Sequence, residues 1–384
     1  MNQSLVDELI SVANTFGANP EYSRAGGGNA SVKFDGILHI KPSGVPLATL
    51  VATDLVPLWI EVLLEALRSD EPVEGDPVRA AAAKAQVGDA GARRPSVEIL
   101  FHALIPDALV LHTHPLVANA VTCNTDAEAL LDQLLGDEAV LVPYTDPGVP
   151  LAREVERVRN AYTARTGRPA PGITLLGNHG IIVSGNSAAE LTERAERLTA
   201  TIAAAIDSTP ALPAEVTDAS ALTQLLNVVA PTLRGLLGSS DRLAVVTSDA
   251  SDLVRSVTTT PAGTALLSDG PLIPDQIVYA GSLPLVLRLS TDADLAAQVT
   301  EAVSAYRELH SKDPIITVVP GLVAFGAGAD LAAAQTALAT FTDALRVARD
   351  ANRIGTVRCL DAAQREFIEN WEAESYRKAV AASA

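Results

Sequence analysis

The first 206 residues alternate between short apolar runs and longer stretches in which apolar residues recur every three to four positions. The short runs predict strands, and the longer periodic stretches predict helices. We expect strands at residues 32–34, 37–40, 108–113, 139–142, 173–176 and 181–184. We expect helices at residues 4–17, 53–69, 115–122, 150–165 and 187–206, with one more that begins at Pro95. Strands and helices therefore interleave, which predicts an α/β domain.

The second half repeats this alternation after a segment that is typical of a linker. Residues 207–213 contain two prolines and small polar residues that interrupt the helical pattern. Beyond them we expect strands at 243–247, 285–287 and 315–319, and helices at 291–309, 329–350 and 361–381. We interpret Gly326-Ala327-Gly328 as a close-packed loop rather than a dinucleotide-binding turn. We therefore expect two α/β domains, residues 1–208 and residues 214–384.

Composition narrows the classes of partner and the compartment. The 384 residues carry a net charge of −18, which disfavours nucleic acid because phosphate binding needs a basic face. No apolar run is long enough to cross a membrane, and the N-terminus lacks the pattern of a secretory signal. The two cysteines, Cys123 and Cys359, lie far apart, which is typical of a reducing compartment. We therefore expect a cytoplasmic protein with no nucleic-acid or membrane partner.

Two histidines lie two positions apart where a predicted strand ends. Alternate side chains of a strand share a face, so His112 and His114 can both face one ion. His179 follows in a Gly-Asn-His-Gly turn between two further predicted strands. Three histidines with an open position are the usual layout of a catalytic zinc site. The alternative is a chance pair, which is as common for an isolated His-x-His.

Glu98 is the next candidate, because it lies in a predicted helix shortly before the strand that carries His112. We expect it in the first turn of the helix that begins at Pro95. A carboxylate there could reach a metal or abstract a proton. The alternative is a glutamate that only complements the helix dipole. His102, four residues later on the same helix face, is interpreted as a packing or supporting residue.

Three elements before the histidines are suited to bind an anion. Glycines 26–28 lead into Asn29 and Ser31 and can expose consecutive backbone N–H groups. Lys41-Pro42-Ser43-Gly44 is the second element, and Ser96 at a predicted helix N-terminus is the third. Positive charge nearby comes from Arg24, Lys33 and Lys41. A single glycine turn is more often only a turn, but three such elements before a histidine set form a sharper pattern.

In their order along residues 4–206, these motifs resemble the class II aldolase/adducin family. The resemblance is carried by Gly27-Gly28-Asn29-Ala30-Ser31, Lys41-Pro42-Ser43-Gly44, Pro95-Ser96-Val97-Glu98, His112-Thr113-His114-Pro115, Pro143-Tyr144-Thr145-Asp146-Pro147-Gly148 and Gly177-Asn178-His179-Gly180. It implies a three-layer α/β domain with a central, mainly antiparallel sheet. A smaller C-terminal α/β domain is expected beside it.

The resemblance also implies roles for individual residues. Zn²⁺, or another divalent cation such as Mn²⁺ or Co²⁺, is expected on His112, His114 and His179. Glu98 is implied as the acid/base next to the metal. The residues implied to bind a substrate phosphate are Gly28, Asn29, Ser43, Gly44 and Ser96.

One departure concerns the phosphate. Fuculose-type enzymes carry two adjacent serines before the glutamate, whereas the second position here is Val97. One hydrogen-bond donor is therefore missing, and an unphosphorylated substrate stays open. Residues 93–98, 274–279 and 367–374 resemble the aldolase half of bifunctional rhamnulose-phosphate aldolase/dehydrogenase proteins. We expect no dehydrogenase half, because the chain ends at Ala384.

Together these implications predict a zinc-dependent class II aldolase that cleaves a ketose through a metal-bound enediolate. The expected substrate is a sugar phosphate or a related hydroxy-ketone. Tyr144 is expected to move the proton on the aldehyde side, with a packed loop aromatic as the equal alternative. A phosphopentose 4-epimerase or a metal-dependent decarboxylase would use the same chemistry. The alternative outside the enzymes is an adducin-like assembly protein, but such proteins lose the metal histidines that this chain retains.

The expected C-terminal domain offers no second catalytic site. It contains one histidine, His310, and no clustered metal ligands. Its last predicted helix carries Trp371 and Tyr376 among charged residues, which is typical of a contact surface. Because family enzymes build their sites at subunit boundaries, we expect this domain to support oligomerisation or complete the pocket. We expect a homo-oligomer, with a tetramer favoured.

Overall fold

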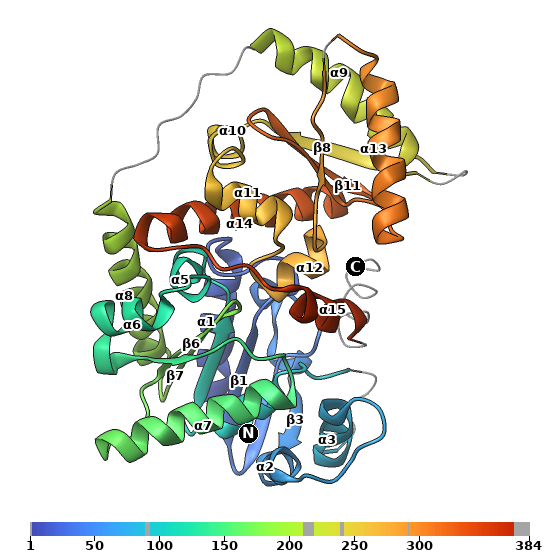
Figure 1. The fold of residues 1–384 in the computed structure, drawn as a ribbon. Coiled ribbons are helices and arrows are strands. Elements are labelled where there is room, and N and C mark those ends of the chain that lie inside the picture. Colours follow the sequence, from blue (N-terminus) through green and yellow to red (C-terminus); the bar gives the residue numbers. More distant parts are fainter. Residues whose placement is uncertain (1, 89–92, 210–218, 239–241, 291, 372–384) are drawn as a thin grey trace. The chain divides into compact units, whose positions relative to one another are not determined.

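The computed structural model describes residues 2–88, 93–209, 219–238, 242–290 and 292–371. By their contacts these residues divide into two compact units, each with its own sheet (Figure 1). The first unit lies within residues 1–122, 126–208 and 370–384, and the second within residues 123–125 and 209–369. None of the described helices is both long and apolar enough to cross a membrane.

The first unit is built around a seven-stranded sheet with the strand order β3-β2-β1-β4-β7-β6-β5. Its strands are β1 (Asn29–Phe34), β2 (Ile37–Ile40), β3 (Val56–Trp59), β4 (Leu109–Thr113), β5 (Val140–Val142), β6 (Ile173–Leu176) and β7 (Gly180–Gly185). Each strand pairs antiparallel with its neighbours, except that β5 and β6 are parallel. The prediction of a mainly antiparallel central sheet is therefore confirmed.

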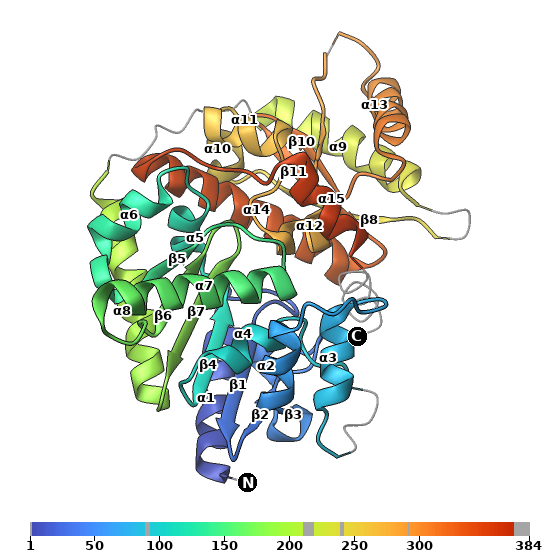
Figure 2. The ribbon, with the colours of Figure 1, turned by 60° about the horizontal axis from the view of Figure 1, so that its bottom comes forward.

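Helices cover both faces of this sheet (Figures 1 and 2). One face carries α1 (Gln3–Ala18), α5 (Leu116–Thr122) and α8 (Ala188–Asp207), with α6 (Ala127–Leu134) against α5 and α8. The other face carries α2 (Ile60–Arg68), α3 (Pro77–Ala85), α4 (Ile99–Leu104) and α7 (Val149–Thr166). Short 3₁₀ turns occur at Leu47–Thr49, Ala52–Asp54 and Gly136–Glu138. The result is the three-layer α/β arrangement that the resemblance implied.

The second unit has a four-stranded sheet with the order β8-β11-β10-β9. Its strands are β8 (Val245–Asp249), β9 (Leu285–Val286), β10 (Ile316–Val319) and β11 (Val323–Gly328). Its helices are α9 (Ala219–Leu236), α10 (Asp252–Val257), α11 (Pro261–Ser268), α12 (Pro274–Ala280), α13 (Leu295–His310), α14 (Leu331–Ile354) and α15 (Ala362–Asn370). Helix α14 packs along β8, β10 and β11, whereas α9 and α13 pack against each other. This unit is α/β, as expected.

Two segments adopt a different type of secondary structure from the one predicted. Residues 53–69 were predicted as one helix but contain strand β3 before α2. Residues 56–59 alternate between buried and more exposed positions, a period-two pattern that lets β3 extend the β1–β2 hairpin. Residues 326–328 were predicted as a loop but form the end of strand β11. Glycine fits there because a Cβ at Gly326 would lie 2.7 Å from the carbonyl oxygen of Ala334.

The helix predicted from Pro95 begins four residues later, at Ile99. Pro95 instead forms an isolated bridge with Pro42. The Ser96 hydroxyl oxygen accepts the backbone N–H of Glu98 at 3.2 Å, within a turn that precedes the helix. The placement of Ser96 at a helix N-terminus was therefore wrong, and Glu98 is the residue at the N-cap position.

Two further predictions fall partly outside the described residues. The last helix was expected over residues 361–381, and the described helix α15 ends at Asn370. Tyr376 lies outside the described residues. Of the expected linker at 207–213, residues 210–213 also lie outside them.

Candidate metal centre

Three histidines from two separate segments converge at one end of the central sheet. His112 is on β4, His114 follows that strand, and His179 lies in the turn between β6 and β7. One ring nitrogen from each lies within 4.8 Å of the other two. The structure therefore brings together the three residues that the sequence predicted as metal ligands.

The backbone around them explains this convergence. Strand β4 lies between β1 and β7, with His112 opposite Asn29 on one side and Ile182 on the other. In the turn that carries His179, Asn178 adopts a left-handed conformation with φ of 48°, which asparagine tolerates better than most residues. Gly180 has no room for a side chain, because a Cβ would lie 2.5 Å from the carbonyl oxygen of Thr113. Glycine at this position thus lets the turn approach the end of β4.

His112 is held in the form that binds a metal. Its Nδ1 lies 2.8 Å from the carbonyl oxygen of Ile181, so this nitrogen carries the proton and donates it. The other nitrogen, Nε2, then presents a lone pair, and it lies 3.0 Å from Nε2 of His114. Burial, followed by the neighbouring His114 and His179, holds the pKa of His112 well below its ordinary value. The ring is therefore neutral, as a metal ligand must be.

Glu98 lies close to these histidines, at the start of helix α4 in a layer that covers the sheet. Its carboxylate is almost fully buried, with Oε1 3.3 Å from Nε2 of His179 and Oε2 3.5 Å from Nε2 of His112. The side-chain amide of Asn29 donates a hydrogen bond to Oε2. Glu98 thus lies beside the histidines, where it was expected, although at the N-cap of α4 rather than in its first turn.

This donor set fits a divalent cation. Ligand atoms on a tetrahedral zinc ion with bonds of about 2.0–2.1 Å lie about 3.3 Å apart. The spacings of 3.0, 3.3 and 3.5 Å among His112, His114, His179 and Glu98 match that separation. The Nε2 atoms of His112 and His114, 3.0 Å apart, can share either a proton or a cation. Three neutral imidazoles and a carboxylate are ligands that zinc accepts.

The predicted phosphate residues come from loops that lie side by side. The backbone N–H of Ser43 donates to the carbonyl oxygen of Arg94 at 2.8 Å, which joins the loop of Ser43 and Gly44 to the segment of Ser96. Gly44 has a positive φ of 85°. These three residues are therefore near one another, and their role in binding phosphate stays a prediction.

Asn29 and Gly28 also have structural roles that are independent of ligand binding. The Asn29 amide is engaged with Glu98, so it orients a carboxylate here. Gly28 has a φ of 74°, and a Cβ there would lie 2.7 Å from the backbone oxygen of His112. Glycine is thus needed for the turn to pass strand β4.

Two lysines that were expected to supply positive charge near the anion site instead bind backbone carbonyl oxygens. The ammonium group of Lys41 donates to the carbonyl oxygen of Val45 at 2.6 Å. That of Lys33 donates to the carbonyl oxygens of His102 and Ile105, at 2.8 and 2.5 Å. These lysines therefore stabilise loops and a helix end, which the sequence pattern did not indicate.

Tyr144 lies half-buried in the loop between β5 and α7. Its hydroxyl donates to Oδ1 of Asp146 at 3.3 Å, a weak contact. Its catalytic role stays a prediction.

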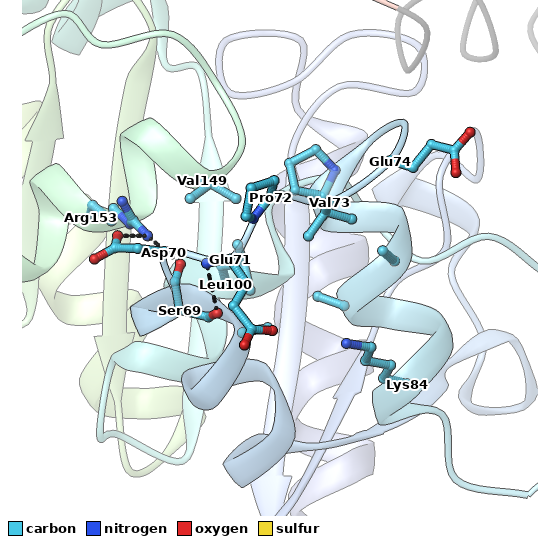
Figure 3. Close-up of a pocket in the computed structure, with 14 residues that line it drawn as sticks. Ser69, Asp70, Glu71, Pro72, Val73, Glu74, Lys84, Leu100, Val149 and Arg153 are labelled. Carbon is cyan, nitrogen blue, oxygen red and sulfur yellow. Dashed lines mark hydrogen bonds and ion pairs between the residues drawn. The ribbon is translucent and has the colours of Figure 1, made fainter.

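Two cavities of the first unit lie apart from the histidines. One, of about 540 Å³, is lined by residues 69–74, α3 and the start of α7, including Lys84 and Arg153 (Figure 3). Another, of about 350 Å³, is lined partly by Arg93, Arg94 and Ser96. Only Ser96 among the predicted site residues lines either cavity.

Residues 7–206 match the family described as "Class II Aldolase and Adducin N-terminal domain". The chain belongs to this family. Its enzymes generally use a divalent metal, in keeping with the histidines found here.

Individual proteins extend this comparison. An "uncharacterized oxidoreductase YuxG" of Bacillus subtilis (strain 168) is 23% identical over 418 residues, which cover 98% of this chain and 58% of that protein. The chain thus spans little more than half the length of that relative.

Two solved structures are also similar to this chain. The N-terminal class II aldolase domain of a conserved protein from Thermoplasma acidophilum is 24% identical, with a TM-score of 0.46 over 52% of this chain and 92% of that one. YgbL from Escherichia coli, titled a putative aldolase/epimerase/decarboxylase, is 25% identical, with a TM-score of 0.38 over 58% and 98% of the two chains.

Proposed function

We propose that this chain is a zinc-dependent class II aldolase that cleaves a ketose, with a ketose phosphate as the favoured substrate. The observation that carries the proposal is the group formed by His112, His114, His179 and Glu98 within the family's domain. Membership of the family supports an aldolase, epimerase or decarboxylase. Among these three reactions we propose aldol cleavage.

His112, His114 and His179 would hold the ion, with their orientation fixed by the Ile181 carbonyl and the Gly180 turn. The bound zinc would supply a Lewis acid that polarises substrate oxygens next to the bond that breaks. Mn²⁺ or Co²⁺ could occupy the same nitrogen and oxygen donors.

Glu98 would take and return the proton at the donor carbon of the substrate. The amide of Asn29 holds one of its oxygens, Oε2, and the other, Oε1, beside His179, would act on the reacting carbon. Burial of this carboxylate keeps bulk water from competing for the proton. Tyr144 would move the proton at the aldehyde fragment, since a phenol is a suitable acid for an alkoxide oxygen.

The loops around the group would bind the phosphate of the substrate. The link between Ser43 and the segment of Ser96 supports this assignment, as do the contact of Asn29 with Glu98 and the Ser96 hydroxyl beside the Glu98 N–H. The proposed residues are Gly28, Asn29, Ser43, Gly44 and Ser96.

We further propose that the first unit is the catalytic domain and that the second is an accessory domain. The second would support oligomerisation or complete the pocket in a homo-oligomer. Among the described residues, the one group of three potential metal ligands lies in the first unit. This distribution supports the assignment of the chemistry.

The test is to load the purified protein with Zn²⁺, Mn²⁺ or Co²⁺ and offer it matched phosphorylated and free ketoses. Aldehyde and ketone fragments are expected from one or more ketoses. Epimerised pentose phosphate, or release of CO₂ from a β-keto acid, would replace the aldolase by the corresponding reaction. Absence of both bound metal and turnover would favour an adducin-like assembly protein.

A further inference from the structure

We propose that Ser31 and His102 are positioning residues that fix Glu98 beside the metal ligands. The proposal rests on the proposed function, because it assumes that Glu98 acts at the metal. It assigns a task to a buried polar pair outside the group of proposed metal ligands, in which the His102 backbone N–H also donates to the carbonyl oxygen of Glu98 at 3.5 Å.

The geometry begins with three alternate residues of β1. Asn29, Ser31 and Lys33 lie on one face of the strand, because side chains two positions apart point the same way. Asn29 is opposite His112 in the sheet, so this face is also the face of His112. Helix α4 is in the layer that covers this face of the sheet.

Each of the three residues bonds to a different level of α4. Asn29 donates to the carboxylate of Glu98 at the N-cap. The Ser31 hydroxyl and Nδ1 of His102 lie 2.7 Å apart, one helical turn further on. Lys33 donates to the carbonyl oxygens of His102 and Ile105 where the helix ends. Helix α4 is thus attached to β1 at its beginning, middle and end.

The middle contact matters because α4 is short. It has six residues, from Ile99 to Leu104, and a helix of this length has too few internal hydrogen bonds to fix its own position. No side chain caps its N-terminus. Contacts with neighbouring elements therefore decide where Glu98 lies: α2 and α7 pack against the helix, and β1 adds the hydrogen bonds described above.

The chemistry of the pair favours positioning over packing alone. Ser31 and His102 are both fully buried, in surroundings that include Phe101 and Val110 of the apolar core. An apolar pair would fill such a place without the loss of hydration that buried polar groups suffer. A hydrogen bond between fixed groups instead defines the distance and the rotation of the helix relative to the strand.

The experiment uses the full chain loaded with Co²⁺, whose visible absorption reports the donors around the ion. Ser31→Ala and His102→Leu remove the contact, and His102→Asn places an amide where Nδ1 lies and can restore it. Ser184→Ala is the control, because Ser184 is also a buried serine of this sheet and bonds to Asp107. Circular dichroism and metal content are measured for every variant.

We expect Ser31→Ala and His102→Leu to bind Co²⁺ but to shift its spectrum in the direction that Glu98→Gln does. His102→Asn and Ser184→Ala should keep the wild-type spectrum. In turnover, the first two variants should lower kcat about tenfold with KM changed less than about twofold, because a small misplacement of a catalytic group slows the reaction. In a Glu98→Gln background, the same changes should have no further effect on kcat.

An unchanged Co²⁺ spectrum in folded Ser31→Ala and His102→Leu would overturn the proposal. So would additive losses of kcat in the Glu98→Gln background, because they would mean that the pair does not act through Glu98. If His102→Leu does not fold, Ser31→Ala and His102→Asn carry the same test. Failure of the wild-type protein to bind Co²⁺ would overturn the proposed metal centre itself. Normal Co²⁺ binding with unaltered variant spectra would overturn only the role of Ser31 and His102, so the two outcomes can be told apart.

Discussion

The two units of this chain bury polar side chains in different ways. In the second unit, Thr258 bonds to the backbone of Val254 and Gly321, and Gln276 bonds to the backbone of Leu272. Asn124 bonds to the backbone of Ala351 and Thr356. Ser282 and Asp350 instead pair with the side chains of Glu369 and Arg349. Most of these bonds thus satisfy backbone groups.

Around His112 in the first unit, buried polar side chains instead bond to each other across long stretches of sequence. Asn29 and Glu98 are 69 positions apart, and Ser31 and His102 are 71 apart. Burial of polar groups at a sheet–helix interface costs stability unless their positions are well matched. We infer that the first unit tolerates this loss of stability beside His112, because polar groups there must be held in fixed positions.

Loss of the metal ligands should have the largest effect. The double substitution His112→Ala and His114→Ala should abolish bound metal and turnover, because one imidazole and a carboxylate are too few ligands for zinc. Metal analysis and an activity assay measure the result, with circular dichroism to verify the fold. His310→Ala in the second unit is the matched control and should retain both. Full metal content in the double variant would exclude the assigned ligands.

Loss of the carboxylate should come next. Glu98→Gln should retain part of the metal but slow proton exchange at the donor carbon by about 10²–10⁴-fold, the usual contribution of a general base. Exchange of deuterium into the donor substrate, followed by NMR, measures this rate. Glu156→Gln, at a surface glutamate paired with Arg68, is the control. Wild-type exchange in Glu98→Gln would reduce Glu98 to a residue that only supports the helix end.

Changes in the phosphate loops should be smaller and selective. Ser43→Ala should raise KM for a ketose phosphate by about tenfold and leave the free ketose almost unaffected, because one hydrogen bond to a charged group is lost. Ser69→Ala, a change at a serine in the wall of the cavity in Figure 3, is the control. Equal effects on both substrates would mean that the loops are structural and that the substrate carries no phosphate. Asn29→Leu is less selective because Asn29 also holds Glu98.

The smallest effect concerns pH and stability. Burial, together with Lys33 and Lys41, keeps the pKa of His102 well below its ordinary value. The unfolded chain takes up this proton near pH 6.5 while the folded chain does not, so stability falls as the pH drops below about 6.5. The loss approaches about 1.4 kcal/mol per pH unit for such a histidine.

His102→Asn should therefore reduce the acid sensitivity of the metal-free protein. Thermal unfolding in a chelator, between about pH 7.5 and about pH 5.5, measures the change. The variant should lose less stability over this interval than the wild type. An identical loss in both proteins would show that His102 takes up its proton in the folded state as readily as in the unfolded one.

The sequence was most informative where chemistry depends on local spacing. The short apolar runs at 32–34 and 37–40 predicted two adjacent strands, and His112 with His114 indicated a shared face of one strand. Family resemblance linked these motifs to Glu98. In each case residues close in sequence, or a motif of known order, carried the information.

The rest depended on contacts that no local pattern contains. Residues 56–59 were assigned to a helix because apolar residues before α2 fit either period, and only pairing with β2 makes them a strand. Helix α4 begins later than predicted, at Ile99, and Pro95 instead pairs with Pro42. The contact of Ser31 with His102 joins segments that neither spacing nor composition relates.

X-ray absorption of the zinc-loaded protein tests the central claim most directly. The account predicts a shell of nitrogen and oxygen atoms at about 2.0–2.1 Å, with the outer scattering of three imidazoles. This signal should lose imidazole scattering in His179→Ala. A shell with sulfur at about 2.3 Å, or one of oxygen atoms without imidazole scattering, would contradict it. Either result would place the metal away from His112, His114 and His179.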